Sequence, residues 1–505
     1  MYRARGEMYE TLGEFEQARA DYEQALDAGG LAHDHLAQWQ SLFDLGFLWT
    51  GRDYVRAGDY LQRALELARS MGNPSTLAHS LNRLGNWHAN VEEPLEGQRY
   101  HQEALTIFHG LNDQRGLAET LDLLGVATSL GGDILASTRY YEQAITLWRA
   151  LEDRQGLLSS LIFFVGRGTA YFTTTMVCLT TSGAECIRDG EEALALGRQL
   201  RVRSDEAFAH LYLGLCLGPR GEYGRAFSSA ETGLNIAREI EHGPWMATGY
   251  LLLGILSLEL LVRPSARQHL ERALTLAKEC GSLFLLRGAT AFLASACIAQ
   301  GDCARAKVVL DDVFGPQTPC QTMAQRLVWC ARAELELAQA HPDQALSIID
   351  RLISTAAHVE DGAVIPRLWH LRGEALVALG RMEEALAVLC SARDAAQRQG
   401  ARPFLWRICV TLGKYYRTQA SRQRAEEAFA LARTTLEELA STVPDHDLRD
   451  HFLRHATAHL PPLRQPSPHH AVRQAFGGLT EREREVAVLI AQGKSSRAIA
   501  DELMV

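Results

Sequence analysis

Residues 2–26 read YRARGEMYETLGEFEQARADYEQAL, and the placing of small and large side chains in this stretch decides the fold. Gly6 lies where the two helices of a hairpin would cross closely, and Ala25 lies in the second of these helices. Small residues at such points let two backbones approach where larger side chains would clash. The intervening apolar residues fall at helical spacing, so the stretch predicts a hairpin of two amphipathic helices.

The same small residues return along the chain every 39 or 40 residues. The repeated positions are Gly6, Gly46, Gly85 and Gly125 in the first helix, Ala25, Ala64, Ala104 and Ala144 in the second, and later Gly214 with Gly254, Gly373 with Gly413, and Ala392 with Ala432. Such a unit is stable only when stacked on its neighbours. The sequence therefore predicts an all-α solenoid of about eleven hairpins over residues 1–440.

The individual units resemble tetratricopeptide repeats. The resemblance rests on three stretches, through Gly6, Tyr9, Ala18, Tyr22 and Ala25, through Trp369, Gly373, Ala385, Leu389 and Ala392, and through Leu412, Gly413, Tyr416, Ala425, Phe429 and Ala432. The fifth unit, around Tyr171 to Ala193, carries an insertion. The resemblance implies a right-handed superhelix whose concave wall is formed by the first helix of each pair.

Concave walls of such solenoids bind peptides, proteins or small ligands, so we expect this surface to bind a protein partner or a small-molecule inducer. The candidate residues on the second, third and fourth units are Phe43, Phe47, His79, Asn82, Asn86, Asn90, Glu119 and Asp122. Asparagine offers both a donor and an acceptor, which suits a peptide backbone or sugar hydroxyls. Alternatively, asparagine near the Leu84–Gly85 pair is simply common in repeats of this kind.

Residues 479–505, LTEREREVAVLIAQGKSSRAIADELMV, predict two short helices joined by a tight turn. Thr480 and Glu483 have the spacing of a capping box. Val486, Leu489 and Ile490 form one apolar face, and Gly493 stands where a helix end favours a left-handed residue. Ser496 is expected to cap the second helix, with inward residues Ile499, Ala500 and Leu503.

This pattern resembles the first half of a LuxR-type helix-turn-helix DNA-binding domain. In that family the recognition helix would begin just after Val505, so the motif is incomplete and this chain by itself is not expected to read DNA sequence. Lys494, Ser496 and Arg497 are candidates for phosphate contacts in the completed domain, or equally a solvated turn. From Arg464 onward six Lys or Arg residues oppose five Asp or Glu residues, which gives no strong basic footprint.

Residues 441–478 are interpreted as a capping helix and a proline-rich linker between the two parts. His451, His455 and His459 fall on one helix face, with Asp447 one turn earlier. This spacing can hold a metal ion, but a solvated helix that caps the last repeat explains it equally well, so no metal site is predicted. The following LPPLRQPSPHH has four prolines and reads as a stiff, exposed linker.

Composition indicates a soluble cytoplasmic protein. The chain of 505 residues has a net charge of −10, 47% hydrophobic residues and 22% charged residues. This acidity disfavours a surface that coats nucleic acid or anionic membranes. The ten cysteines form no C-x-x-C pair and are interpreted as buried thiols in a reducing compartment. The stretch Leu157 to Ala184 is broken by Arg167 and is not expected to span a membrane.

No catalytic residues are predicted. Gly493-Lys494-Ser495 lacks the earlier glycine and the preceding strand of a phosphate-binding loop, and no G-x-S-x-G or H-E-x-x-H sequence occurs. The chain is therefore not expected to be an enzyme, and no cofactor is expected in it.

A repeat solenoid followed by a LuxR-type end resembles the large ATP-binding regulators related to MalT. That resemblance implies ATP only in a nucleotide-binding domain that would precede Met1 in a parent protein. It also implies a solenoid that senses a signal, self-association, and control of DNA binding once the helix-turn-helix is complete. The alternative is a stand-alone protein-protein interaction scaffold with a vestigial DNA-binding end.

Overall fold

Short polar side chains set the beginnings of many helices in the computed structural model. Asp53 accepts hydrogen bonds from the amides of Val55 and Arg56 at 3.0 and 3.1 Å. Such caps satisfy amides that have no partner inside the helix.

The structure describes residues 1–178, 183–315, 317–462 and 479–504, and within these ranges it contains α-helices and short 3₁₀-helices but no strand. The predicted all-α class is confirmed.

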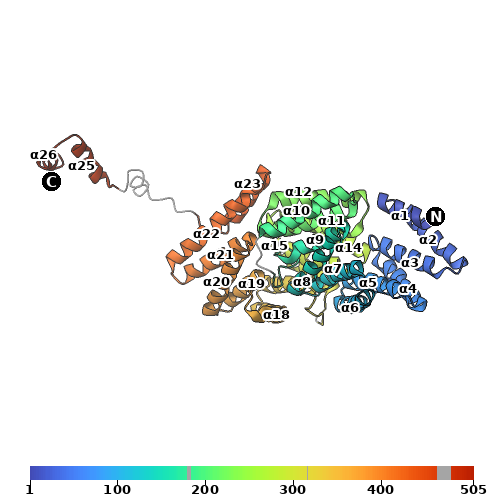
Figure 1. Cartoon of the computed structure of the whole chain (residues 1–505). Helices are drawn as coiled ribbons and strands as arrows, with labels where there is room; N and C mark the ends of the chain where they lie inside the picture. Colours follow the sequence, from blue (N-terminus) through green and yellow to red (C-terminus); the bar gives the residue numbers. More distant parts are fainter. Residues whose placement is uncertain (179–182, 316, 463–478, 505) are drawn as a thin grey trace. The chain divides into compact units, whose positions relative to one another are not determined.

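Contacts divide the chain into two units, Met1–His459 and Leu460–Val505, which are described separately. The first unit begins with five helical hairpins that follow one another along the chain (Figure 1). They are α1 (Tyr2–Leu12) with α2 (Phe15–Leu31), α3 (His35–Thr50) with α4 (Tyr54–Met71), α5 (Pro74–Asn90) with α6 (Pro94–Leu111), α7 (Gln114–Leu130) with α8 (Ile134–Ala150), and α9 (Arg154–Phe164) and η1 (Val165–Arg167) with α10 (Gly183–Leu200).

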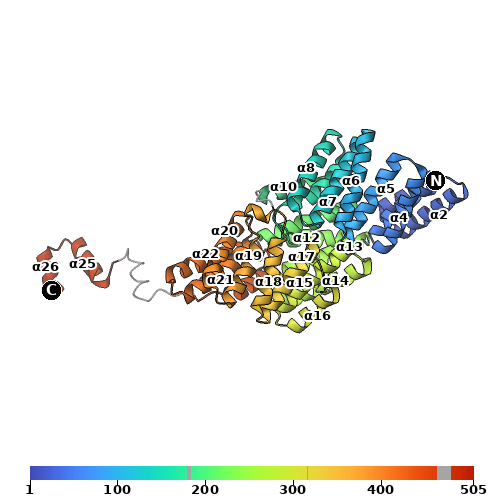
Figure 2. The ribbon, with the colours of Figure 1, turned by 90° about the horizontal axis from the view of Figure 1, so that it is seen from below.

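Six further hairpins and a final helix complete this unit, and Figure 2 shows them continuing from green through yellow to orange. The hairpins are α11 (Arg203–Leu217) and η2 (Gly218–Arg220) with α12 (Tyr223–Glu239), α13 (Gly243–Glu259) with α14 (Arg263–Cys280), α15 (Leu283–Ala299) with α16 (Cys303–Val313), α17 (Met323–Ala338) with α18 (Pro342–Ser354), α19 (Pro366–Ala378) with α20 (Met382–Arg398), and α21 (Arg402–Thr418) with α22 (Arg422–Ser441). The short η3 (Val359–Asp361) precedes α19, and α23 (His446–Thr457) packs on α22.

The repeated glycines lie where the two helices of a hairpin touch. A Cβ atom on Gly46 would stand 2.6 Å from Leu61 of the paired helix, and one on Gly125 would stand 2.7 Å from the ring of Tyr141. The facing side chains Leu61 and Tyr141 are buried. The 40-residue spacing in the sequence is therefore the spacing of these close crossings.

The first helices of successive hairpins also contact one another. For example, α5 contacts α7, and α13 contacts α15. These helices therefore form the inner wall of the solenoid. Residues 168–178, called here the inner segment, lie between α9 and α10, and 168–176 are buried. The ring of Phe172 packs edge-on against Phe284 of α15, with 5.2 Å between ring centroids. The insertion in the fifth unit thus contributes core to hairpins far along the chain.

The second unit contains α25 (Glu481–Ala491) and α26 (Ser496–Glu502). Thr480 and Glu483 form the predicted capping box, and Gly493 has the predicted positive φ of 75°. One expectation about this unit was wrong. Ser495, not Ser496, caps α26, accepting from the amide of Ala498 at 3.4 Å. Ile490 is exposed, because contact between α25 and α26 buries Leu489 and Ile499 instead.

The sequence also predicts a proline-rich linker and no membrane-spanning segment. Most of the predicted proline-rich linker, residues 463–478, lies outside the described residues. Among the helices that the structure does describe, none combines the length and the apolar character needed to cross a bilayer.

Candidate functional site

The inner wall of the first four hairpins carries aromatic side chains beside an arginine. Phe43 and Phe47 lie one turn apart on α3, and the side chain of Phe47 is 45% exposed. The guanidinium of Arg83 on α5 lies over both rings, 5.4 Å from the centroid of Phe43 and 4.7 Å from that of Phe47. Cation–π contacts of this kind hold a guanidinium and an aromatic face together at a solvent-accessible surface.

Two more predicted residues, His79 and Glu119, join this group. The Glu119 carboxylate on α7 lies 3.7 Å from Arg83 and 3.8 Å from His79. The His79 ring also packs edge-on against Phe108, with 5.0 Å between centroids. The structure therefore brings Phe43, Phe47, His79 and Glu119 together around Arg83, a residue that the sequence analysis did not select.

Asn86 and Asn90 lie one turn apart on the same helix and are partly exposed. The Asn90 amide donates to the backbone carbonyl of Asn86 at 2.8 Å. Within the described residues, this bond and a longer one to the Asn86 side-chain oxygen are the hydrogen bonds that the two carboxamides make. Donor and acceptor capacity therefore remains for a ligand on this face.

Asn82 and Asp122 lie inside the wall and do not line its surface, contrary to expectation. Asn82 is 0% exposed, and its amide donates to Thr120 at 2.8 Å. Asp122 is also buried and accepts from the hydroxyls of Ser159 and Ser160 at 3.1 and 2.7 Å. Polar groups on neighbouring first helices satisfy each other here, so both positions hold the stack together.

Acidic side chains extend the surface toward α1. Asp44 on α3 binds the guanidinium of Arg3 at 2.5 Å, and Glu10 accepts from the Tyr22 hydroxyl at 2.6 Å. Burial raises the pKa of both Glu10 and Asp44, although the tyrosine and arginine hydrogen bonds oppose this shift. These carboxylates stand near Arg83, so the wall combines acidic groups, one central guanidinium and exposed aromatic surface.

Further along the wall, the inner segment leaves little free space. A cavity of about 40 Å³ remains beside it, enclosed mainly by apolar side chains including Phe163, Phe172, Tyr212 and Met323. That volume is far below the roughly 300 Å³ or more of pockets that bind small molecules. The surface around Arg83 is therefore the better candidate for binding a partner.

The three histidines expected on one helix face, two in α23 and one just after it, interact with the solenoid or with each other. His451 donates from Nε2 to the carbonyl of Leu261 at 3.2 Å, and its ring lies 4.0 Å from that of His455. His459 lies 6.3 Å from the ring of Trp406. Among the described residues, no group of three or more His, Cys, Asp or Glu side chains has metal-binding geometry.

In the second unit, the three candidate phosphate contacts lie around the turn before α26. Ser496 and Arg497 are exposed on its first turn, whereas the Lys494 ammonium forms an ion pair with Glu502. The Arg482 side chain donates to the carbonyl of Leu503 and pairs with Glu485 at 3.0 Å. Carboxylates of the same unit thus pair with two of its basic side chains, those of Lys494 and Arg482.

Comparison with known proteins identified the repeats. The tetratricopeptide repeat family model matches residues 1–28 and 366–393, which confirms the predicted repeats in those two segments. No curated protein sequence matched the chain.

Solved structures similar to the chain include a Rap protein complexed with competence and sporulation factor, with 12% identity, 81% of this chain and 98% of that chain covered, and a TM-score of 0.48. Yeast Tom70 shares 14% identity over 94% of this chain and 98% of its own, with a TM-score of 0.33. A STAND ATPase with a tetratricopeptide repeat sensor from Pyrococcus horikoshii shares 13% identity over 73% of this chain and 54% of its own, with a TM-score of 0.40.

Proposed function

We propose that this chain is the sensing part of a signal-responsive transcription regulator, in which the solenoid binds a partner and controls a C-terminal DNA-binding domain. The observation that carries the sensing role is the surface around Arg83. There the exposed ring of Phe47, a guanidinium and the carboxylate of Glu119 lie within contact distance on three successive hairpins.

The chemistry of this surface fits a peptide segment of a protein partner. The carboxamides of Asn86 and Asn90 suit main-chain amide and carbonyl groups. The face of Phe47 suits an apolar or cationic side chain, and Asp44 and Glu10 add negative charge beside it. A small-molecule inducer with hydroxyl groups is the other ligand that these groups could hold.

The C-terminal helix pair supports the regulatory part of the proposal. It has the capping box at Thr480, the left-handed Gly493 and the buried Leu489 and Ile499 on which the LuxR-type resemblance rests. DNA binding is proposed only for the completed domain, and ATP binding only for a domain preceding these residues in a parent protein.

The proposed mechanism is a population shift. A partner that binds one solenoid conformation better than another changes the balance between them by no more than its difference in affinity. That change would alter self-association and the presentation of paired DNA-binding domains.

An interaction scaffold without DNA binding is the second candidate function. It is favoured by the ion pair between Lys494 and Glu502, which occupies one of the three groups expected to contact phosphate. On this alternative the surface around Arg83 still binds a partner, and the helix pair contributes nothing to DNA affinity.

Chromatin immunoprecipitation tests the proposal. A tag inserted at the native chromosomal locus retains all sequence that flanks the chain described here. Enrichment at discrete chromosomal sites, lost on changing Lys494 and Arg497 to glutamate, is expected for the regulator. Recovery of a protein partner sensitive to Arg83→Glu without any DNA enrichment would favour the scaffold, and absence of both would refute the two proposals.

A further inference from the structure

Successive turns of the solenoid touch along one edge, which we call the seam. It consists of the turns inside hairpins 2, 3, 4, 6 and 7 and of the loop and helix residues that contact them, which lie 180 to 230 positions further along the chain. At hairpin 2, the amide of Gly243, the first residue of α13, donates to the carbonyl of Gly51 at 3.0 Å. At hairpin 6, the amide of Gly224 in α12 donates to Thr442 at 3.0 Å. Amides that a helix N-terminus leaves unpaired are thus satisfied across the seam.

Charged side chains also meet across this edge. Arg52 pairs with Glu241 at 2.9 Å and Glu222 with Arg402 at 2.7 Å, and the His358 imidazole forms a 2.9 Å hydrogen bond with Asp133. Unlike pairs spaced along one helix, these pairs join residues at least 180 positions apart. Polar contacts therefore make up part of the seam, beside apolar ones such as that between the buried rings of Tyr223 and Phe452, whose centroids are 6.2 Å apart.

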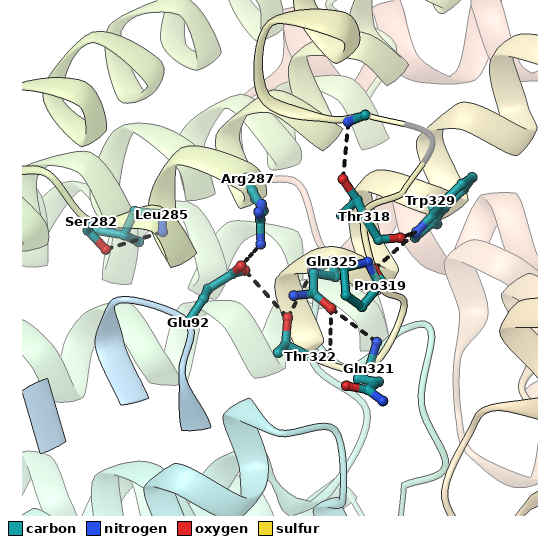
Figure 3. Close-up of polar contacts among 11 residues, drawn as sticks. Glu92, Ser282, Leu285, Arg287, Thr318, Pro319, Gln321, Thr322, Gln325 and Trp329 are labelled. Carbon is teal, nitrogen blue, oxygen red and sulfur yellow. Dashed lines mark hydrogen bonds and ion pairs between the residues drawn. The ribbon is translucent and has the colours of Figure 1, made fainter. Parts of the chain in front are cut away.

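The pair between Glu92 and Arg287 is the most buried of these ion pairs. The Glu92 side chain is 5% exposed and that of Arg287 is 17% exposed. Thr322 donates to the other Glu92 oxygen at 3.4 Å, so the carboxylate joins the turn of hairpin 3 to both α15 and the start of α17 (Figure 3). The Arg287 Nε is buried without a hydrogen-bond partner among the described residues, so Glu92 supplies its compensating charge.

The backbone at Glu92 is unusual for this side chain. Its φ is +68°, a left-handed conformation that favours glycine. The residue immediately before the second helix's cap is glycine in five other hairpins, at Gly13, Gly132, Gly221, Gly301 and Gly380. Three further hairpins carry Leu261, Ala340 or Ala420 at this position, also with positive φ, so glycine is favoured there but not required. Hairpin 3 places a glutamate at this position, and that glutamate pairs with Arg287.

We propose that Glu92 and Arg287 form a latch that holds successive turns of the solenoid together, and that its release opens the seam. With the carboxylate gone, the guanidinium would lie in a mostly dry interface without a counter-charge, and separation of the turns would hydrate it. The use of this opening to transmit partner binding rests on the proposed function, but the latch itself does not.

Glu92→Gly tests the latch without disturbing the turn, because the other hairpins show that glycine suits this backbone. The matched control is Glu152→Gly, which also replaces a left-handed glutamate, at φ +56°, but at an exposed position outside the seam. Purified full-length variants are compared by small-angle X-ray scattering and by hydrogen exchange of segments containing Gly243 and Gly224. For Glu92→Gly we expect a larger radius of gyration and an opening equilibrium raised about 100-fold, the effect of breaking a buried ion pair.

The double variant Glu92→Arg with Arg287→Glu is the second test, because it exchanges the two charges and keeps an ion pair between these positions. It is expected to return both the radius of gyration and the exchange toward the unmodified protein. Equal scattering and exchange for Glu92→Gly and Glu152→Gly would overturn the latch, as would a swapped variant as open as Glu92→Gly. Neither measurement uses a partner or DNA, so failure of the latch is distinguishable from failure of the proposed function.

Discussion

The guanidinium of Arg326 donates two hydrogen bonds, at 3.1 and 2.8 Å, to the carbonyl oxygen of Thr175, which lies 151 residues earlier in the chain. Thr175 belongs to the inner segment and Arg326 to α17, so this contact ties the insertion of hairpin 5 to hairpin 9. The same side chain donates to the carbonyls of Leu352 and Cys320 and is 1% exposed. Among the described residues no carboxylate pairs with this guanidinium, so backbone oxygens hold it, and burial lowers its pKa to about 10.

Arg326→Met is therefore expected to destabilise the solenoid by at least about 3 kcal/mol, because several buried carbonyls lose their donor at once. The matched control is Arg422→Met, which removes an exposed arginine paired with Glu426 on the same helix. Such surface pairs contribute about 0.3–0.5 kcal/mol. Urea unfolding followed by circular dichroism measures both variants, and similar midpoints for the two would contradict the prediction.

Gly46→Ala tests the close crossing in hairpin 2. The added Cβ would stand 2.6 Å from the buried side chain of Leu61, so we expect a loss of roughly 1–3 kcal/mol from overpacking. Gly110→Ala in α6 is the control, because a Cβ there meets no atom within 4 Å. That change is expected to be neutral or to stabilise by up to about 1 kcal/mol. Thermal unfolding of both variants decides, and a neutral Gly46→Ala would refute the crossing as the reason for the repeated glycine.

The buried carboxyl group of Asp122 is expected to make the free energy of unfolding depend on pH. Burial raises its pKa from 3.8 to about 6, against the opposing hydrogen bonds from Ser160 and Ser159. The folded state therefore binds the proton of the Asp122 carboxyl more tightly than the unfolded chain does. The resulting contribution to the free energy of unfolding is fully present below about pH 4 and is lost as the pH rises through 6. The loss amounts to about 3 kcal/mol above pH 7.

Asp122→Asn is expected to remove this contribution to the pH dependence and to raise the unfolding midpoint at pH 8. Asp59→Asn, at an exposed position on α4, serves as the control. Unfolding at pH 5 and pH 8 compares the two variants with the unmodified protein. If Asp122→Asn leaves the difference between the two pH values unchanged, the buried carboxylate is not its source.

The hairpins were predictable from the sequence because their contacts are local. Gly46 and Leu61 are 15 positions apart, and the requirement for a small residue recurs with every unit. The seam was not predictable in this way. Whether Glu92 meets Arg287 depends on small rotations that accumulate over five hairpins, and no pattern in a single unit encodes their sum.

The candidate surface was predicted only in part, because some of its residues depend on contacts within one unit and others on contacts between units. Phe47 and Glu119 were found because they occupy inner positions of their own units. Asn82 and Asp122 occupy comparable positions, but polar partners on the next hairpin bury them, and partner identity does not follow from spacing. Arg83 was missed although it precedes Gly85 by two positions, as Asp44 precedes Gly46, a recurrence that could have marked both.

Partner binding gives a prediction for the surface around Arg83. Phe47→Ser is expected to weaken capture of the partner by about 1–3 kcal/mol in binding free energy, and Arg83→Glu by at least as much, because each removes a central contact. Val55→Ser is the control, since Val55 is also apolar and is more exposed than Phe47, but it lies on the second helix of hairpin 2. Affinity purification from cells, followed by titration calorimetry, measures the change. Equal losses for Val55→Ser and Phe47→Ser would exclude this surface as the site.

The ion pair between Lys494 and Glu502 gives the last prediction, which concerns the completed DNA-binding domain. Glu502→Gln releases the Lys494 ammonium, so non-specific DNA affinity should rise and one further cation should be displaced per protein bound. The slope of log affinity against log salt is then expected to steepen by about 0.9. Lys494→Gln should lower the affinity and flatten the slope by the same amount if Lys494 contacts phosphate in spite of its partner. Fluorescence anisotropy with duplex DNA at several salt concentrations measures both slopes. If both Glu502→Gln and Lys494→Gln leave the slope of the unmodified protein unchanged, Lys494 does not reach a phosphate.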